Sequence, residues 1–115
     1  MRSKIGDKER LGHILDSIQE IELATKDLLK GEFLENHIIR IAVVKWLEII
    51  GEAANFVTTE TKEKSINVPW NEVIGFRHVA VHEYFGVEFE LVWKILQDDL
   101  NDLKKEIEIL YKEFE

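Results

Sequence analysis

Cysteine is absent from this chain of 115 residues, and proline and glycine are scarce, with one and six copies. Without cysteine the chain can form neither a disulfide framework nor a thiolate metal site, and a reducing cytoplasm is the compartment we expect. The scarcity of helix breakers, combined with abundant Leu, Ile, Glu and Lys, predicts an all-α fold. The length suits a single domain, spanning residues 1–115, with a core of moderate size.

Long uninterrupted apolar segments are also missing. The first ten residues, MRSKIGDKER, lack the apolar region of a signal peptide. The most apolar stretch, residues 38–57, is interrupted by four charged side chains, which excludes a membrane span. We therefore expect a cytoplasmic protein without a membrane partner.

A basic surface is a third feature that the composition does not provide. The formal net charge is −8, and residues 88–115 hold nine acidic side chains against four lysines. Phosphate binding generally uses a positively charged surface, so this balance counts against strong nonspecific affinity for nucleic acid. It leaves room for a local site built around a few arginines.

Apolar residues recur at three- and four-residue steps over most of the chain, which predicts a bundle of four main helices. We expect them at about residues 7–30, 36–57, 69–85 and 88–115. Gly31 and Gly86 would end the first and third helices, and Pro69 would lie in the first turn of the third. Residues 58–67 are polar without periodicity and predict a connection. Short loops of this kind favour an up-down, mostly antiparallel arrangement.

The second predicted helix is apolar around almost its whole circumference, which indicates burial on more than one side. In so small a domain one side can face the core and another a second copy of the chain. Gly51, Ala53 and Ala54 would allow close backbone approach between subunits. The sequence therefore predicts a homodimer.

The most informative stretch is RHVAVHEY, from Arg77 to Tyr84. It holds a permanent cation, an imidazole and a phenol within two helical turns. An arginine can neutralise phosphate charge, and a histidine can transfer protons near neutral pH. Arg77 and His82 therefore form a minimal set for cleaving a phosphodiester without a metal.

Simpler interpretations stay open on these residues alone. Arg77 could pair with a carboxylate of the bundle, His82 could be a satisfied core histidine, and Tyr84 could be a core aromatic with a hydrated hydroxyl. His78 and His82 have the spacing of a zinc-binding helix, but no third ligand accompanies them, so we expect no metal. Two other histidines stand alone and are predicted to face solvent: His13 and His37.

Three segments resemble one known family: LDSI at residues 15–18, IGEAANFV at 50–57 and VPWNEVIGFRHVAVHEYFGVEFELVW at 68–93. In order and spacing they are similar to the HepT-like proteins of the HEPN superfamily. These are ribonuclease toxins of prokaryotic toxin–antitoxin pairs whose partner is a minimal nucleotidyltransferase. The likeness covers nearly the whole chain and includes the family signature of Arg, four residues, His, one residue and Tyr.

The resemblance implies a HEPN-like helical bundle and a metal-independent endoribonuclease without cofactor, acting on tRNA or mRNA in a groove between two protomers. Arg77 and His82 match the catalytic arginine and histidine. His78 stands where the family often has Asn and would support them. Tyr84 matches the tyrosine that the nucleotidyltransferase modifies with AMP to silence the toxin. Glu52 matches a recurrent acidic position to which we assign no role.

The expected product is a 2′,3′-cyclic phosphate, because RNA carries its own nucleophile in the ribose 2′-hydroxyl. Two alternatives remain. The acidic balance and the replacement of Asn by His78 favour a non-catalytic nucleotide- or protein-binding helical module that partners a nucleotidyltransferase. The other is a structural dimer in which the Arg/His/Tyr cluster only packs.

Overall fold

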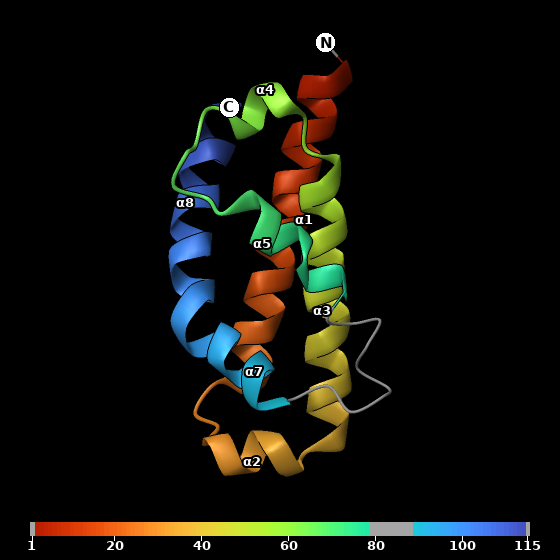
Figure 1. Ribbon diagram of the computed structural model, residues 1–115, viewed down its shortest axis with the longest axis vertical. Coiled ribbons are helices and arrows are strands. Elements are labelled where there is room, and N and C mark those ends of the chain that lie inside the picture. The colour runs from red at the N-terminus through yellow and green to blue at the C-terminus, as the bar shows by residue number, and fades with distance from the viewer. Residues whose placement is uncertain (1, 79–88, 115) are drawn as a thin grey trace.

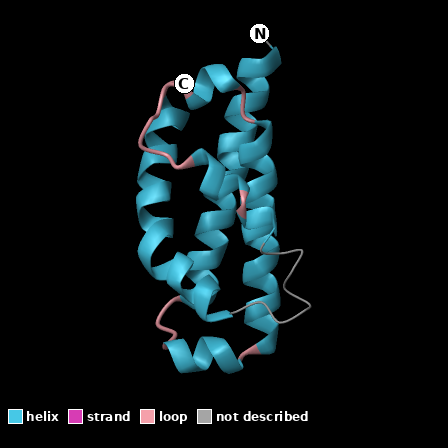
Figure 2. Ribbon diagram, viewed as in Figure 1, coloured by secondary structure: helices cyan, strands magenta, loops and turns pink. Residues whose placement is uncertain are grey.

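The computed structural model describes residues 2–78 and 89–114, with side chains from residue 6 onward. Within these ranges every regular element is helical, and there is no strand (Figure 2). The prediction of an all-α fold is confirmed. The elements are α1 (Arg2–Thr25), α2 (Lys30–Glu35), α3 (His37–Phe56), α4 (Thr59–Lys62), α5 (Trp70–Ile74), α7 (Phe89–Lys94), η2 (Ile95–Asp99) and α8 (Leu100–Lys112).

Three long helical segments run along the molecule: α1, α3 and the consecutive series α7, η2 and α8 (Figure 1). α1 packs against both α3 and α8, and α5 lies against α3. α2 crosses one end of the bundle and α4 the other (Figure 1). The chain descends through α1, ascends through α3, descends through α5 and ascends again through α7, η2 and α8, which agrees with the predicted up-down bundle (Figure 1). None of the described helices combines the length and apolarity needed to cross a bilayer.

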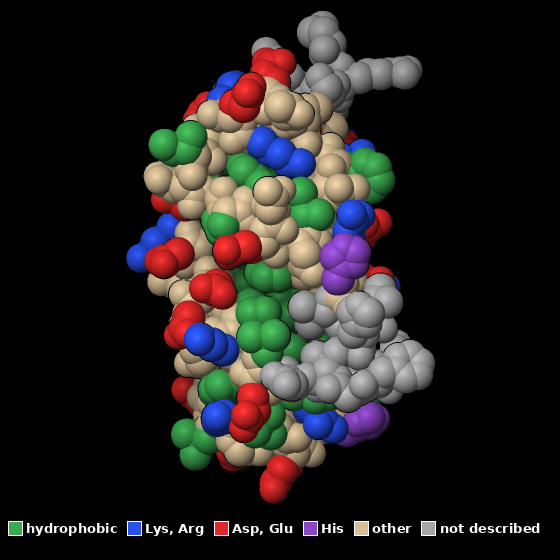
Figure 3. Space-filling model, in the orientation of Figure 1, with side chains coloured by type: hydrophobic (Ala, Val, Ile, Leu, Met, Phe, Trp, Pro, Cys, Tyr) green, Lys and Arg blue, Asp and Glu red, His purple; other side chains and the backbone are tan. Residues whose placement is uncertain are grey.

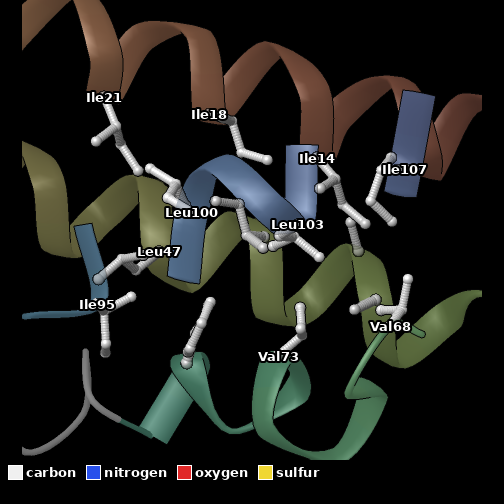
Figure 4. Packing of buried hydrophobic residues seen from close by; sticks show 14 of the residues in the cluster. Ile14, Ile18, Ile21, Leu47, Val68, Val73, Ile95, Leu100, Leu103 and Ile107 are labelled. Carbon is white, nitrogen blue, oxygen red and sulfur yellow. The ribbon is translucent and has the colours of Figure 1, made fainter. Parts of the chain in front are cut away.

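The core lies between α1, α3 and α8, with α5 closing one side (Figure 4). Isoleucines from α1 face leucines from α3 and α8, and all of them are at most 5% exposed. Burying each such side chain contributes roughly 1.5–3 kcal/mol of hydrophobic stabilisation. The central members are Ile14, Ile18, Ile21, Leu47, Leu100, Leu103 and Ile107.

α3 begins and ends where the sequence predicts. The side chain of Asn36 accepts a hydrogen bond from the backbone N–H of Ile39 at 3.0 Å, the usual contact of an N-cap residue. Val57, at the other end, has extended backbone angles that stop the helix.

α1 ends earlier than predicted. It stops at Thr25 rather than Lys30, and Gly31 lies inside α2 instead of ending α1. The reason is Asp27, whose φ of 64° is left-handed and incompatible with a continuing helix. Aspartate tolerates this conformation better than most residues, so a breaker other than glycine ends the helix.

The polar connection at residues 58–67 also differs from the prediction, because it contains α4. Thr58 caps this helix and accepts a hydrogen bond from the Thr61 backbone N–H at 3.4 Å. The carboxylate of Asp7, only 1% exposed, accepts hydrogen bonds from the Thr58 N–H at 3.0 Å and its hydroxyl at 2.6 Å. The Thr61 hydroxyl donates to the same carboxylate. This network ties the beginning of α1 to α4.

Asp7 should make stability depend on pH. Burial alone would raise the pKa of its carboxyl, but hydrogen bonds from Thr58 and Thr61 and the charge of Arg10 outweigh burial and hold that pKa below its usual range. A lowered folded-state pKa contributes stability above the unfolded-state pKa, about 4, and that contribution is lost as pH falls through the folded value. Asp7→Asn should therefore reduce the free energy of unfolding at pH 7 by about 1–3 kcal/mol.

The measurement is urea unfolding of wild type and Asp7→Asn at pH 7 and in acid, where the difference should shrink. Asp16→Asn is the matched control, because Asp16 is exposed on the same helix. A difference between Asp7→Asn and wild type that stayed constant with pH would contradict the assignment.

The third and fourth predicted helices are more broken than their patterns indicate. α5 ends at Ile74, a turn follows at Gly75, and residues 76–78 are helical again. Pro69 is the N-cap residue of α5 rather than a member of its first turn. The last helix contains a π-helical turn, η2, between α7 and α8.

Candidate active site

The candidate site begins where α3 passes the backbone that follows α5. A Cβ atom added to Gly51 would lie 2.6 Å from the backbone nitrogen of Arg77 and 3.0 Å from the carbonyl oxygen of Ile74. Only glycine allows the two segments to approach this closely. The prediction that Gly51 serves a subunit interface is therefore wrong: its close contact lies within the chain. The two alanines assigned to that interface are buried as well, Ala53 and Ala54.

This contact presents Arg77 beside Glu52, the residue that follows Gly51 on α3. Nη1 of Arg77 donates a hydrogen bond to Oε1 of Glu52 at 3.0 Å. The arginine side chain is 33% exposed and the glutamate 51%, so solvent screens the pair and its contribution to stability is about 0–1 kcal/mol. Nε of Arg77 is buried and has no hydrogen-bond partner among the residues that the structure describes. One edge of the guanidinium is therefore oriented by Glu52.

Neighbouring residues fix the backbone of residues 76–78, the helical turn that carries Arg77. Phe76 is 8% exposed and belongs to the core, which anchors the backbone immediately before Arg77. The backbone N–H of His78 donates to the carbonyl of Gly75 at 2.9 Å. The His78 side chain is exposed next to the guanidinium-bearing residue. Successive residues thus present a partly exposed cation and an exposed imidazole at the surface.

The other two predicted site residues, His82 and Tyr84, lie outside the described residues. The convergence of Arg77 with them, and the groove between two protomers, therefore stay predictions. In the part of the chain that the structure describes, no three His, Asp or Glu side chains gather as a metal would require. His13 and His37 are exposed, as predicted.

Sequence reasoning missed the pairing of Glu52 with Arg77. The two residues are 25 positions apart, and helical periodicity cannot indicate which distant helix a glutamate will meet. One signal was available in Gly51, because a glycine inside an apolar helix often marks close packing. The pairing agrees with the simpler interpretation of Arg77 as an ion-pair partner, but its exposure leaves the guanidinium accessible to a ligand.

Negative charge is concentrated elsewhere, between α5 and α8. A cavity of about 200 Å³ lies there over Val73, Phe76 and Leu103. Its carboxylates are Glu72, Asp99, Asp102 and Glu106. Burial, and then the neighbouring charges of Asp98 and Glu72, raise the pKa of the Asp99 carboxyl. A phosphate would be repelled from this cavity. Carboxylates also gather over α8 in Figure 3, whereas the visible histidines lie on the side of α3.

Comparison with known proteins gives the family of this fold and site. The model of the family described as "HepT-like: Ribonuclease HepT-like" matches residues 14–110, which include both Glu52 and Arg77. The protein named "Putative RNase MJ1380" from Methanocaldococcus jannaschii is 44% identical over 108 residues, which cover 94% of this chain and 99% of that protein.

Two further relatives have similar names and coverage. The "Probable ribonuclease HepT" of Thermococcus cleftensis is 34% identical over 109 residues, covering 95% of this chain and 99% of its own length. The "Putative RNase TTE0752" of Caldanaerobacter subterraneus is 36% identical over 104 residues, covering 90% and 93%. No solved structure matches the chain. The match to the family and the all-α bundle agree, and the chain belongs to the HepT-like ribonuclease family of HEPN-type proteins.

Proposed function

We propose that this protein is a metal-independent endoribonuclease toxin that cleaves RNA, either tRNA or mRNA. The observation that carries the proposal is the surface guanidinium of Arg77, which Gly51 and Glu52 hold in one orientation. Support comes from relatives named as ribonucleases that cover almost the full length of the chain.

In the proposed reaction the ribose 2′-hydroxyl attacks the adjacent phosphorus atom. A neutral imidazole, assigned to His82, accepts the hydroxyl proton, and a second imidazole or a water protonates the departing 5′-oxygen. The bond from phosphorus to the 5′-oxygen breaks, leaving a 2′,3′-cyclic phosphate and a free 5′-hydroxyl. Arg77 stabilises the charge that develops on the phosphorus oxygens. His78 supports them with a hydrogen-bonding group beside Arg77.

We assign Glu52 a positioning role in this site. A guanidinium has five N–H donors, and the bond to Glu52 uses one of them, on Nη1. The remaining donors on the terminal nitrogens can reach a phosphate. Because Glu52 already holds one edge of the guanidinium, Arg77 has less rotamer freedom to lose when RNA binds, and the entropy cost of binding is smaller.

The proposed enzyme is a homodimer with residues from both protomers lining the groove. α3 leaves two large apolar side chains exposed at its beginning, Ile38 at 78% and Ile41 at 41%, and burying such residues between two copies would stabilise a dimer. A pair of copies would bring two sets of Arg77 and His82 to one groove, supplying both the base and the acid of the reaction.

A minimal nucleotidyltransferase is the proposed antitoxin, and Tyr84 its target. Attaching AMP to this phenol would add bulk and negative charge seven residues from Arg77. A phosphate there would compete with RNA for the guanidinium. The modification would therefore act as an off-switch.

The test is incubation of purified protein with end-labelled RNA in excess EDTA. We expect cleavage, with a 2′,3′-cyclic phosphate on the upstream fragment. Co-expression with the nucleotidyltransferase should abolish cleavage and add AMP, detected by mass spectrometry, to wild type but not to Tyr84→Phe. Absence of cleavage at high protein concentration, alongside binding to the nucleotidyltransferase, would instead favour a non-catalytic binding module. The acidic cavity between α5 and α8 would suit a basic protein surface rather than a nucleotide, so it supports the protein-binding form of this second candidate.

A further inference from the structure

A second arginine, Arg40 on α3, is held in an unusual setting. The guanidinium carbon of Arg40 lies 4.4 Å from the centroid of the Phe89 ring, at the start of α7. Its Nη2 lies 3.4 Å from Nδ1 of His37. A ring and an imidazole therefore orient this cation without neutralising it.

Acidic side chains do not compensate Arg40 within the described residues. Ion pairs there join other cations to glutamates, with Lys30, Lys45, Arg77 and Lys104 as the basic members. No described carboxylate lies within ion-pair distance of Arg40, and its Nε is buried without a hydrogen-bond partner. The chain has 23 acidic residues against 15 lysines and arginines, so a partly buried arginine without a carboxylate is unexpected. Among the described residues its positive charge therefore has no carboxylate partner, and an external anion could supply one.

The start of α3 adds positive potential beside Arg40, although Glu32 and Glu35 line the same surface hollow as His37. His37 is exposed in the first turn of α3, and that turn contains no acidic residue. The beginning of a helix of 20 residues carries the positive end of its dipole. The Asn36 side chain accepts a hydrogen bond from the N–H of Ile39, and the other N–H groups at the start of a helix have no partner inside it.

Helix geometry relates this place to the candidate active site. Arg40 and Gly51 are eleven residues apart on α3, which corresponds to about 16 Å along the axis and about 20° around it. Both therefore lie on one stripe of the helix, and Gly51 contacts the backbone of Arg77. Val44 and Leu47, which lie between them on this stripe, are 4% and 0% exposed, so RNA cannot follow the stripe itself. The neighbouring stripe of α3, through Ile41, Lys45 and Glu52, is exposed, and one extended strand of RNA is long enough to follow it from one arginine to the other.

We propose that Arg40 and His37 form a second subsite that binds a backbone phosphate of single-stranded RNA, several nucleotides from the linkage cleaved at Arg77. The proposal rests on the proposed ribonuclease function. A guanidinium offers paired donors to phosphate oxygens, and Phe89 keeps it flat and oriented. The subsite contributes binding of longer substrates and takes no part in the chemical step.

The experiment compares Arg40→Gln with wild type on two substrates, a dinucleotide and a single-stranded oligonucleotide. The dinucleotide reaches only the cleaved linkage, so its kcat and KM should stay unchanged. For the oligonucleotide, KM should rise about tenfold with kcat unchanged, as expected for a lost hydrogen-bonded charge contact. Binding of the oligonucleotide to protein carrying Arg77→Ala should also lose about 0.7 from its salt slope when Arg40 is replaced.

Two further variants keep the test interpretable. Lys64→Gln is the matched control: it removes one cation over another aromatic ring, Phe114 at 5.8 Å, at the end of the bundle near α4. It should leave every parameter unchanged. If Arg40→Gln fails to fold, His37→Asn replaces it, because His37 is exposed; a smaller rise in oligonucleotide KM is expected.

The outcomes separate the subsite from the ribonuclease function. Cleavage by wild type with equal oligonucleotide KM values for Arg40→Gln and Lys64→Gln would overturn the subsite and leave the enzyme standing. Equal losses on the dinucleotide and the oligonucleotide would also overturn it, since Arg40 would then act at the cleaved linkage. Binding that depends on Arg40 without any cleavage would support the subsite and refute the ribonuclease.

Discussion

Replacing Arg77 by alanine is expected to slow RNA cleavage by about 10²–10³-fold, the usual effect of removing one group that stabilises transition-state charge. The fold should survive, because the exposed pair with Glu52 contributes only about 0–1 kcal/mol. Single-turnover cleavage measures the first effect and thermal unfolding the second. Loss of activity without loss of stability would separate a catalytic arginine from a structural one.

Glu52→Gln provides the comparison for this prediction. It breaks the same ion pair but keeps the guanidinium, so cleavage should fall by less than in Arg77→Ala while the melting temperatures of the two variants match. If Arg77 served only to pair with Glu52, both variants would cleave RNA like wild type. That result would remove Arg77 from the reaction.

Gly51→Ala is expected to damage both stability and activity. The added methyl group would meet the Arg77 nitrogen at 2.6 Å and the Ile74 carbonyl at 3.0 Å. These are backbone atoms and cannot rotate away, so α3 and the chain after α5 must separate. Overpacking of this kind costs about 1–3 kcal/mol, more than the roughly 1 kcal/mol that alanine gains over glycine in helix propensity. A displacement near 1 Å at Arg77 should slow cleavage by about 10²-fold.

Gly12→Ala is the matched control for this substitution, since Gly12 also lies inside a long helix. Its added Cβ would make only an ordinary contact, 3.8 Å from the Tyr111 ring. This variant should be as stable as wild type or slightly more so in chemical denaturation, with unchanged cleavage. Equal stability of Gly51→Ala and Gly12→Ala would show that the close approach of α3 to Arg77 has no energetic importance.

Local chemistry explains which parts of the fold the sequence predicts. α3 agrees at both ends because Asn36 caps it through a contact only three residues away. The end of α1 depends on the left-handed backbone of Asp27, which no periodicity indicates. α4 depends on Thr58 and on Asp7, 51 positions earlier in the chain. Elements stabilised by distant partners are therefore the ones that the apolar pattern misses.

The candidate site divides in the same way. The sequence and its family resemblance predict Arg77 and His78 as site residues, and the structure places Arg77 partly exposed and His78 exposed, while their roles stay predictions. The roles of Gly51 and Glu52 required the tertiary contact between α3 and the chain after α5. From the sequence alone, the small residues Gly51, Ala53 and Ala54 are as compatible with a subunit interface as with a contact inside the chain. Only packing distinguishes a contact within the chain from one between chains.

The π-helical turn η2 divides the last helix into two segments, α7 and α8, that can point in different directions. Ile95 and Leu100 are both buried although they are five positions apart, a step that would turn the second residue away from the core in an unbroken α-helix. α8 can therefore pack its apolar face against α1. α7 packs instead against α2, where the ring centroid of Trp93 lies 5.2 Å from that of Phe33. Phe89, whose ring lies against the guanidinium of Arg40, thus belongs to a segment that the π-helical turn orients separately from α8.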